Sequence, residues 1–175
     1  MLTKSVNPIN CILMILVFSL CSCAITHQPA ESLFTQDEAA SLDLNQLQGK
    51  SWDDYVNQNL MGSRSASTGP RIEIKYPLIK STNSGPTIET TSPSDMSVIF
   101  TKRKDGNPVD MSSLEVVGKK GWLKQSLTDK FRPYIKGEEI KATNMPIPKG
   151  KFHLQVSIAD TGGLKTVENY LLIVK

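Results

Sequence analysis

The last part of the chain contains the pattern that most restricts its fold. Apolar side chains occupy every second position from Phe152 to Ile158, which is the period of a β-strand with one buried face. The turn sequence Ala159-Asp160-Thr161-Gly162-Gly163 follows, and its glycines accept the positive φ angles of a tight connection. Residues 166–174 are apolar on both sides near their end, as in a central strand. The pattern predicts a hairpin of two strands.

Shorter β-prone segments, separated by turn signals, precede this hairpin. Residues 71–78 alternate in the same way, and Pro77 is typical of a sheet edge. Residues 96–101 also alternate, and Asp105-Gly106 after them is a strong turn signal. Further short strands are predicted at residues 87–91, 114–117 and 139–142. About six to eight short strands predict an all-β, antiparallel sandwich over residues 70–175.

Two motifs in this region are similar to bacterial Ig-like domains. Residues 148–156, followed by the turn at 159–163, resemble their closing hairpin, with Pro-x-Gly, an aromatic or His-containing strand, Asp-x-x-Gly and a last apolar strand. Residues 108–116 resemble their mid-domain strand entry. The resemblance covers residues 86–175 and implies an Ig-like β-sandwich. It implies no activity, because the family includes adhesins, enzyme accessory modules and secretion components.

A second informative pattern lies at the N-terminus. Lys4 is the one charged residue of positions 1–10, and residues 11–20 are apolar except Ser19. This run is too short to span a bilayer core, which needs about 20 apolar residues. A weakly positive start and a short apolar segment are typical of a secretory signal. The alternative is an uncleaved N-terminal helix.

The signal ends in Leu20-Cys21-Ser22-Cys23, which resembles the lipobox of bacterial lipoproteins. In that family the final Cys carries a thioether-linked diacylglycerol, the preceding peptide is removed, and the new amine is acylated, for instance with palmitate. The resemblance implies that residues 1–22 are a signal peptide and that Cys23 is lipidated. Cys21 is a weaker candidate, because the preceding Leu is larger than the pattern accepts. Ala24, in place of an Asp, favours the outer membrane of the bacterial envelope, with the protein facing the periplasm.

This assignment leaves the domain without a free cysteine. Cys11 and Cys21 belong to the signal, and Cys23 carries the lipid. The domain then has no disulfide and no thiolate for a metal or for catalysis. Its hydrophobic core must hold it together.

Between the lipid and the sandwich, residues 23–69 are predicted to form an acidic tether. Residues 24–59 contain six acidic residues against one lysine, a net charge of −5. Residues 60–175 contain 18 basic and 11 acidic residues, a net charge of +7. Residues 62–70 are rich in turn-forming residues and are the expected linker.

The tether contains candidate short helices and a candidate docking site. Ser41 and Ser51 are suitable N-caps. Trp52 and Tyr55 lie three residues apart and would share one helical face. These aromatic residues either dock a partner, as part of residues 33–60, or hold the tether against its own domain.

Two basic turns form a candidate contact for an anionic partner, with the residues Lys102, Arg103, Lys104, Lys119 and Lys120. A sandwich can bring two turns to one end, where they would attract lipopolysaccharide, phospholipid head groups or acidic glycans. The alternative is a solvated surface that protects strand edges from aggregation. The envelope location argues against a nucleic-acid partner. The following segment, residues 122–135, fits neither a strand nor a helix clearly.

Metal and catalytic chemistry have little support in the sequence. A calcium site needs six or more converging oxygen ligands. The carboxylates near the sandwich ends are Asp95, Asp110, Glu138, Glu139 and Asp160, and their spacing does not support such a site. We therefore predict no metal and no cofactor. His153 alternates with apolar neighbours and is therefore expected to be exposed. The sequence contains no nucleophile–base motif, so the protein is not expected to be an enzyme.

The sequence thus predicts a membrane-anchored lipoprotein with a non-catalytic interaction role. Its expected partner is an envelope protein or an anionic envelope polymer, contacted through the sandwich. An alternative is an accessory subunit of an envelope secretion or transport complex that docks through residues 33–60. A third, less favoured possibility is an enzyme that acts on the cell wall.

Overall fold

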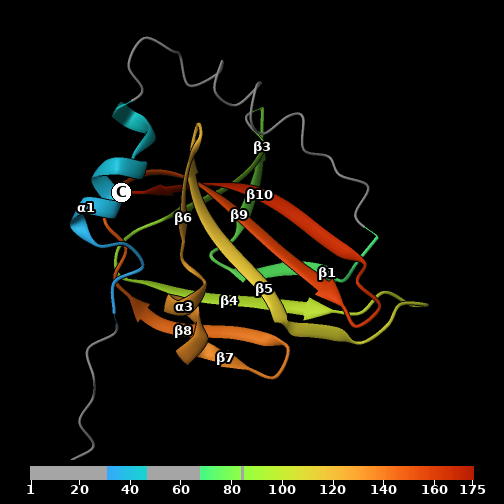
Figure 1. Cartoon of the computed structure of the whole chain (residues 1–175). Helices are drawn as coiled ribbons and strands as arrows, with labels where there is room; N and C mark the ends of the chain where they lie inside the picture. The colour runs from blue at the N-terminus through green and yellow to red at the C-terminus, as the bar shows by residue number, and fades with distance from the viewer. Residues whose placement is uncertain (1–30, 47–67, 84) are drawn as a thin grey trace, which may run out of the picture.

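The computed structural model describes residues 31–46, 68–83 and 85–175, and their strands form two sheets packed face to face (Figure 1). The four-stranded sheet has the order β1-β4-β8-β7 and the six-stranded sheet the order β2-β3-β10-β9-β5-β6. The first sheet consists of β1 (Arg71–Tyr76), β4 (Ser94–Thr101), β7 (Ile135–Lys136) and β8 (Glu139–Met145). The second consists of β2 (Ile79–Thr82), β3 (Gly85–Thr90), β5 (Val109–Lys120), β6 (Leu123–Ser126), β9 (Gly150–Asp160) and β10 (Lys165–Val174). The predicted all-β sandwich is confirmed.

The closing hairpin is the centre of the six-stranded sheet. β9 and β10 pair antiparallel along their whole length, as the alternation predicted. β10 also pairs with β3, in parallel, from Leu171 to Val174. This parallel pair is an addition to the antiparallel arrangement expected from the sequence. It makes β10 a central strand, in agreement with its nearly continuous apolar run.

One hydrophobic core fills the space between the sheets. Phe100 of β4 and Phe152 and Ile158 of β9 are fully buried, because the strand period directs them inward from opposite sides. Burying a large apolar side chain contributes about 1.5–3 kcal/mol. The described residues contain no cysteine, so this core and the backbone hydrogen bonds hold them together.

The helix found in the tether region starts earlier than expected. α1 (Gln36–Leu42) is capped by Thr35 and not by Ser41. Thr35 Oγ1 accepts a hydrogen bond from the Glu38 N–H, and the Glu38 carboxylate accepts one from the Thr35 N–H. This capping box satisfies backbone donors that a helix start leaves free. Ser41 lies in the last turn, where its hydroxyl donates to the Asp37 carbonyl.

The described part of the expected tether packs into the sandwich. Leu33 and Phe34 belong to the main core, and the Phe34 ring stacks on Phe152 with 4.5 Å between the ring centroids. The short 3-10 helix η1 (Leu44–Gln46) lies against β9, and Leu44 packs on the outer surface of β10. Few large apolar residues occur here, but Leu33, Phe34, Leu42 and Leu44 are all buried, so this segment is a covering layer of the domain.

Candidate functional site

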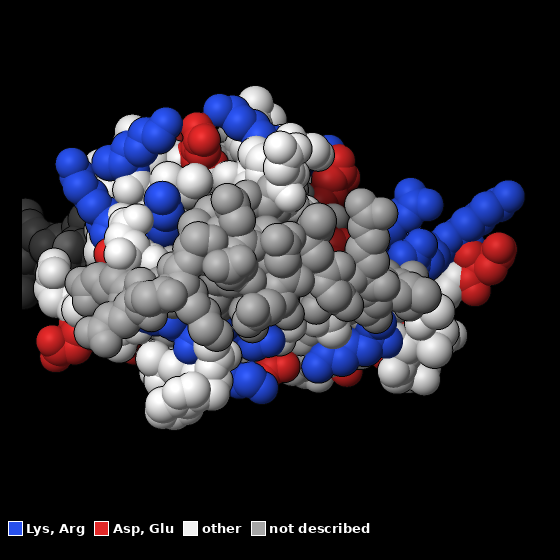
Figure 2. All heavy atoms as spheres, turned by 90° about the horizontal axis from the view of Figure 1, so that it is seen from above, with Lys and Arg blue, Asp and Glu red and all other residues white. Residues whose placement is uncertain are grey.

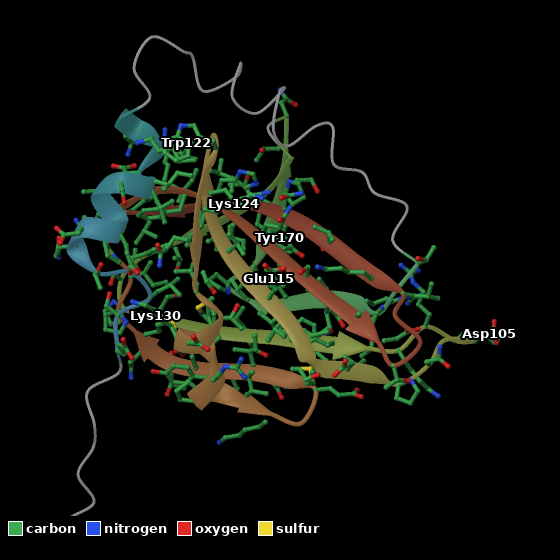
Figure 3. All side chains as sticks on the ribbon, viewed as in Figure 1. Asp105, Glu115, Trp122, Lys124, Lys130 and Tyr170 are labelled. Atoms are coloured by element: carbon green, nitrogen blue, oxygen red, sulfur yellow. The ribbon has the colours of Figure 1, made fainter. Side chains whose placement is uncertain are left out.

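The two basic turns lie at opposite ends of β5. Residues 102–104 belong to the loop before this strand, and Lys119 and Lys120 are its last residues. A strand of 12 residues is about 36 Å long. Figure 3 shows the separation, with Asp105 at the tip of one loop and Trp122 beyond the other end. The sandwich therefore does not bring the five cations together, and Figure 2 shows basic side chains toward both the left and the right of the view.

The first basic turn has a structural role. Arg103 Nε donates to the Gly69 carbonyl over 2.7 Å, which ties the loop to the segment that leads into β1. Lys102 and Lys104 are exposed, and the carboxylate of Asp105 follows them directly in the sequence. Its charge offsets part of theirs, so this loop is the weaker of the two candidate contacts.

The second basic turn is the tip of the β5–β6 hairpin. Lys119 lies opposite Lys124, and Lys120 lies opposite Leu123. Gly121 has a φ of +60°, which the tight turn requires and which a glycine adopts without strain. Trp122 follows and is 91% exposed, more than any other large apolar side chain that the structure describes. Lys120 and Lys124 form no ion pair with the described residues.

Burial and a neighbouring lysine disfavour the positive charge of Lys119 in this hairpin. Its Nζ donates to Gln155 Oε1 over 3.1 Å. Burial lowers the pKa of Lys119, the charge of Lys124 across the strand pair lowers it further, and Glu115 partly opposes both effects. Like charges directly opposite each other in a sheet are unfavourable. An anion bound beside this pair would relieve the repulsion.

α1 braces the hairpin against the core. Gly118 of β5 lies beneath Leu42, and a Cβ at position 118 would come within 2.8 Å of Leu42 Cδ1. Gln125 of β6 donates to Glu38 Oε1 over 3.1 Å. Glu38 Oε2 forms a 3.1 Å ion pair with Lys130, and both side chains are largely shielded from solvent. The base of the hairpin is therefore held in place by α1.

Trp122 is the residue of this site that the sequence analysis missed. It lies at the start of the segment that fitted neither a strand nor a helix, because β6 has only four residues before α3 (Thr128–Phe131) begins. The sequence did contain a signal. A Trp directly after a turn glycine, with a lysine two positions before and after it, predicts an exposed aromatic residue between two cations.

His153 is buried, so the prediction that it is exposed is wrong. It lies opposite Leu171 on the outer surface of the six-stranded sheet, where Leu44 of η1 covers Leu171. His153 Nε2 lies 3.1 Å from Asn169 Oδ1. Burial lowers the pKa of His153 to about 4; the bond to Asn169 opposes this shift and the charge of Lys119 adds to it. This histidine has a structural place in the sheet.

The candidate calcium ligands do not converge. Asp160 is buried and accepts hydrogen bonds from the Gly162 and Leu164 N–H groups of its own turn. Burial raises the pKa of Asp160, but these bonds outweigh that effect and lower it. Asp95 accepts a hydrogen bond from the Asn144 N–H of β8. Within the described ranges, no group of three or more His, Cys, Asp or Glu side chains could hold a metal ion.

Several predicted features lie outside the described residues. These are the signal segment 1–22, Cys23, and the aromatic pair Trp52 and Tyr55. Leu33 and its described apolar neighbours in the expected docking segment are buried against their own domain. In the part of the chain that the structure describes, no helix is long and apolar enough to cross a membrane.

No family model matches the chain, and comparisons with curated proteins and with solved structures found no significant match. The lipoprotein and Ig-like resemblances therefore remain predictions from the sequence. The function is therefore inferred from the chain's own residues, and from the β5–β6 hairpin in particular.

Proposed function

We propose that the protein is a membrane-anchored lipoprotein that faces the periplasm and contacts an anionic envelope partner through the β5–β6 hairpin, without catalysis. The anchor is supported by the lipobox-like sequence that ends at Cys23. One observation carries the contact: Lys120 and Lys124 flank the exposed Trp122, and neither forms an ion pair among the described residues.

The charge arrangement of the hairpin favours an anion. A bound anion would interact with Lys120 and Lys124 and would also relieve the repulsion between Lys119 and Lys124. Exposed charges are screened over about 8–10 Å at physiological salt, so the contact weakens as the salt concentration rises. The basic loop at the other end of β5 offers less, because Arg103 is engaged with the Gly69 carbonyl.

A non-catalytic role agrees with the placement of the most perturbed titratable groups. His153 and Tyr170 have the most displaced pKa values among the described residues, and both are buried. Burial raises the pKa of Tyr170, and the Glu168 carboxylate, which accepts a hydrogen bond from its hydroxyl, raises it further. Both groups are paired within the sheet. Both side chains are packed inside the domain, where a substrate does not reach them.

Metabolic labelling with a palmitate analogue tests the anchor. The wild-type chain is expected to carry the label, and Cys23→Ser to lose it completely, because the thioether and the new N-terminus both depend on that residue. Cys21→Ser is the matched control and keeps the label. Retention of the label in the Cys23→Ser variant would show that the anchor is misassigned.

Two pairs of substitutions test the contact. Lys120→Gln/Lys124→Gln removes two charges from the hairpin, and Lys136→Gln/Lys141→Gln removes two exposed charges from the four-stranded sheet. Both are made in a chain that starts at residue 24 and so keeps every described residue. Binding to lipopolysaccharide and to dextran sulfate is measured as salt rises. The hairpin variant is expected to bind about 30-fold more weakly, at about 1 kcal/mol per lysine, and the control to bind normally.

Equal binding by the two variants would exclude the hairpin as the contact. Binding that does not change with salt would exclude an electrostatic contact anywhere on the domain. The first result would leave the basic loop at the other end of β5 as the candidate contact, and the second would leave the tether.

A further inference from the structure

We infer that Trp122 enters the interfacial layer of an anionic lipid bilayer, which makes the β5–β6 hairpin a second, reversible membrane contact besides the N-terminal lipid. The inference rests on the proposed function, because it specifies lipid as the anionic partner of the same hairpin. Its basis is the combination of one exposed aromatic ring with a lysine two positions before it and another two positions after it in the sequence. Figure 3 labels Trp122 and Lys124 of this hairpin.

The exposure of Trp122 is the first observation. Its ring contributes nothing to the core, and among the described residues it stacks on no other ring. Tryptophan is enriched at membrane–water interfaces, because its ring is largely apolar while its N–H keeps a polar partner. A tryptophan that protrudes from a tight turn can enter that layer without unfolding any backbone.

The flanking lysines are the second observation. In the sequence, Lys120 and Lys124 lie two positions before and after Trp122, and they lie on opposite faces of the hairpin, because Lys120 is paired with the core-facing Leu123 and Lys124 with Lys119. Long lysine side chains can follow an apolar surface while their charge stays in water. Each lysine near an anionic bilayer strengthens association by about fivefold. The hairpin thus combines an apolar anchor with the charge that an anionic surface attracts.

The shape of the tip favours lipid over a protein partner. Leu123, next to Trp122, packs against the core, so the apolar contact of the tip is a single ring. A stable protein–protein interface buries about 800 Å² on each partner, and much of its centre is apolar. A soluble polyanion would engage the lysines but would leave the ring in water. A bilayer interface accepts both.

The proposed anchor makes this contact local. Seven residues, 24–30, lie between Cys23 and the start of the described chain at Glu31, so a fully extended chain separates these two residues by at most about 30 Å. The sandwich would therefore stay close to the membrane that holds its lipid, and the second contact would form within one assembly at a high effective concentration.

Tryptophan fluorescence of the full lipidated chain in vesicles tests the inference. The chain has two tryptophans, so Trp52→Phe leaves Trp122 as the sole emitter. The vesicles contain phosphatidylcholine alone or with phosphatidylglycerol, and some lipids carry bromine on their acyl chains as a quencher. With phosphatidylglycerol, we expect the emission to move to shorter wavelength and bromine to quench it. Lys120→Gln/Lys124→Gln should weaken both effects, and Lys136→Gln/Lys141→Gln should leave them unchanged.

The outcomes separate this inference from the proposed function. A water-like, unquenched Trp122 overturns the inference, and if dextran sulfate binding still depends on Lys120 and Lys124, the proposed function stands. Loss of that dependence as well overturns both. Quenching that is equal with and without phosphatidylglycerol also contradicts an anionic lipid contact. So does a spectral shift that appears only on addition of an acidic protein.

Discussion

The two sheets of the sandwich differ in how their outer surfaces are covered. In the four-stranded sheet, β8 alternates between buried residues such as Ile140 and exposed residues such as Lys141. In the six-stranded sheet, His153 and Leu171 point away from the core and are nevertheless buried. Part of this burial comes from η1, which lies on β9 and β10. Alternation therefore identifies the residues that share a surface, but it does not show whether that surface is exposed.

The largest expected effect is the loss of stability when a core side chain is truncated. On the inner surface this loss should be similar for the two sheets. Phe152→Ala removes a fully buried ring that stacks on Phe34, and Phe100→Ala removes its counterpart from β4. Each should lower the free energy of unfolding by about 3–5 kcal/mol, measured by urea denaturation. A much smaller loss for Phe152 would mean that the segment before α1 is not part of the core.

The outer surfaces should respond differently. Leu171→Ala on β10 should lower the free energy of unfolding by about 2–4 kcal/mol, because the side chain is buried beneath Leu44. Ile99→Ala on β4, where the side chain is only half-buried, should cost about 1 kcal/mol. Equal losses in the same urea titration would remove the difference between the sheets.

Acid should weaken the six-stranded sheet through His153. Its pKa is about 4 in the folded protein and about 6.5 in the unfolded chain, so the unfolded state takes up a proton first as the pH falls. The contribution of neutral His153 to the free energy of unfolding is present above about pH 6.5, and it is lost as the pH falls from there toward 4. Between pH 7 and pH 5 the loss should be about 2 kcal/mol in urea titrations.

A matched substitution isolates this effect. His153→Gln keeps a polar side chain but cannot titrate, so its stability should change little between pH 7 and pH 5. Glu38 and Asp160, whose pKa values are lowered in the folded protein, affect stability only at lower pH. If the substituted protein loses as much stability as the wild type over that interval, the buried neutral histidine is not responsible.

The smallest expected effect concerns packing where the two sheets meet. An apolar cavity of about 40 Å³ lies between them, lined by Val98 of β4 and Val156 of β9 among others. Val156→Ile adds one methyl group toward this space and should raise the free energy of unfolding by about 0.5–1 kcal/mol. Val117→Ile, on the outer surface of β5, is the control and should give no gain. A destabilised Val156→Ile protein would indicate overpacking.

The sequence was sufficient for the elements whose signal is local. The strict alternation of residues 152–158 and the glycine-containing turn after it predicted β9 and β10, and the apolar end of β10 predicted a central position. The spacing Thr35-x-x-Glu38 is also that of a capping box, although Ser41 was the predicted cap. Local periodicity and capping chemistry do not depend on distant parts of the chain.

Contacts between distant residues could not be read in this way. Nothing near Phe34 indicates that its ring stacks on Phe152, so the segment was assigned to the tether. The two basic turns were expected together because a sandwich can bring two turns to one end, and the strand between them was predicted to be short, at residues 114–117. In the structure β5 continues through Gly118, whose missing side chain makes room for Leu42. The longer strand separates the turns, and only the hairpin side remains a candidate site.

The position of β10 also sets an order of events during synthesis. β10 joins β2 and β3 to the rest of the six-stranded sheet, and its parallel partner β3 lies more than 80 residues earlier in the chain. Pairings over such sequence separations form slowly. A growing chain that lacks residues 165–174 cannot complete this sheet and exposes its unpaired edges. The six-stranded sheet is therefore completed only after β10, which is made later than all the strands that it joins.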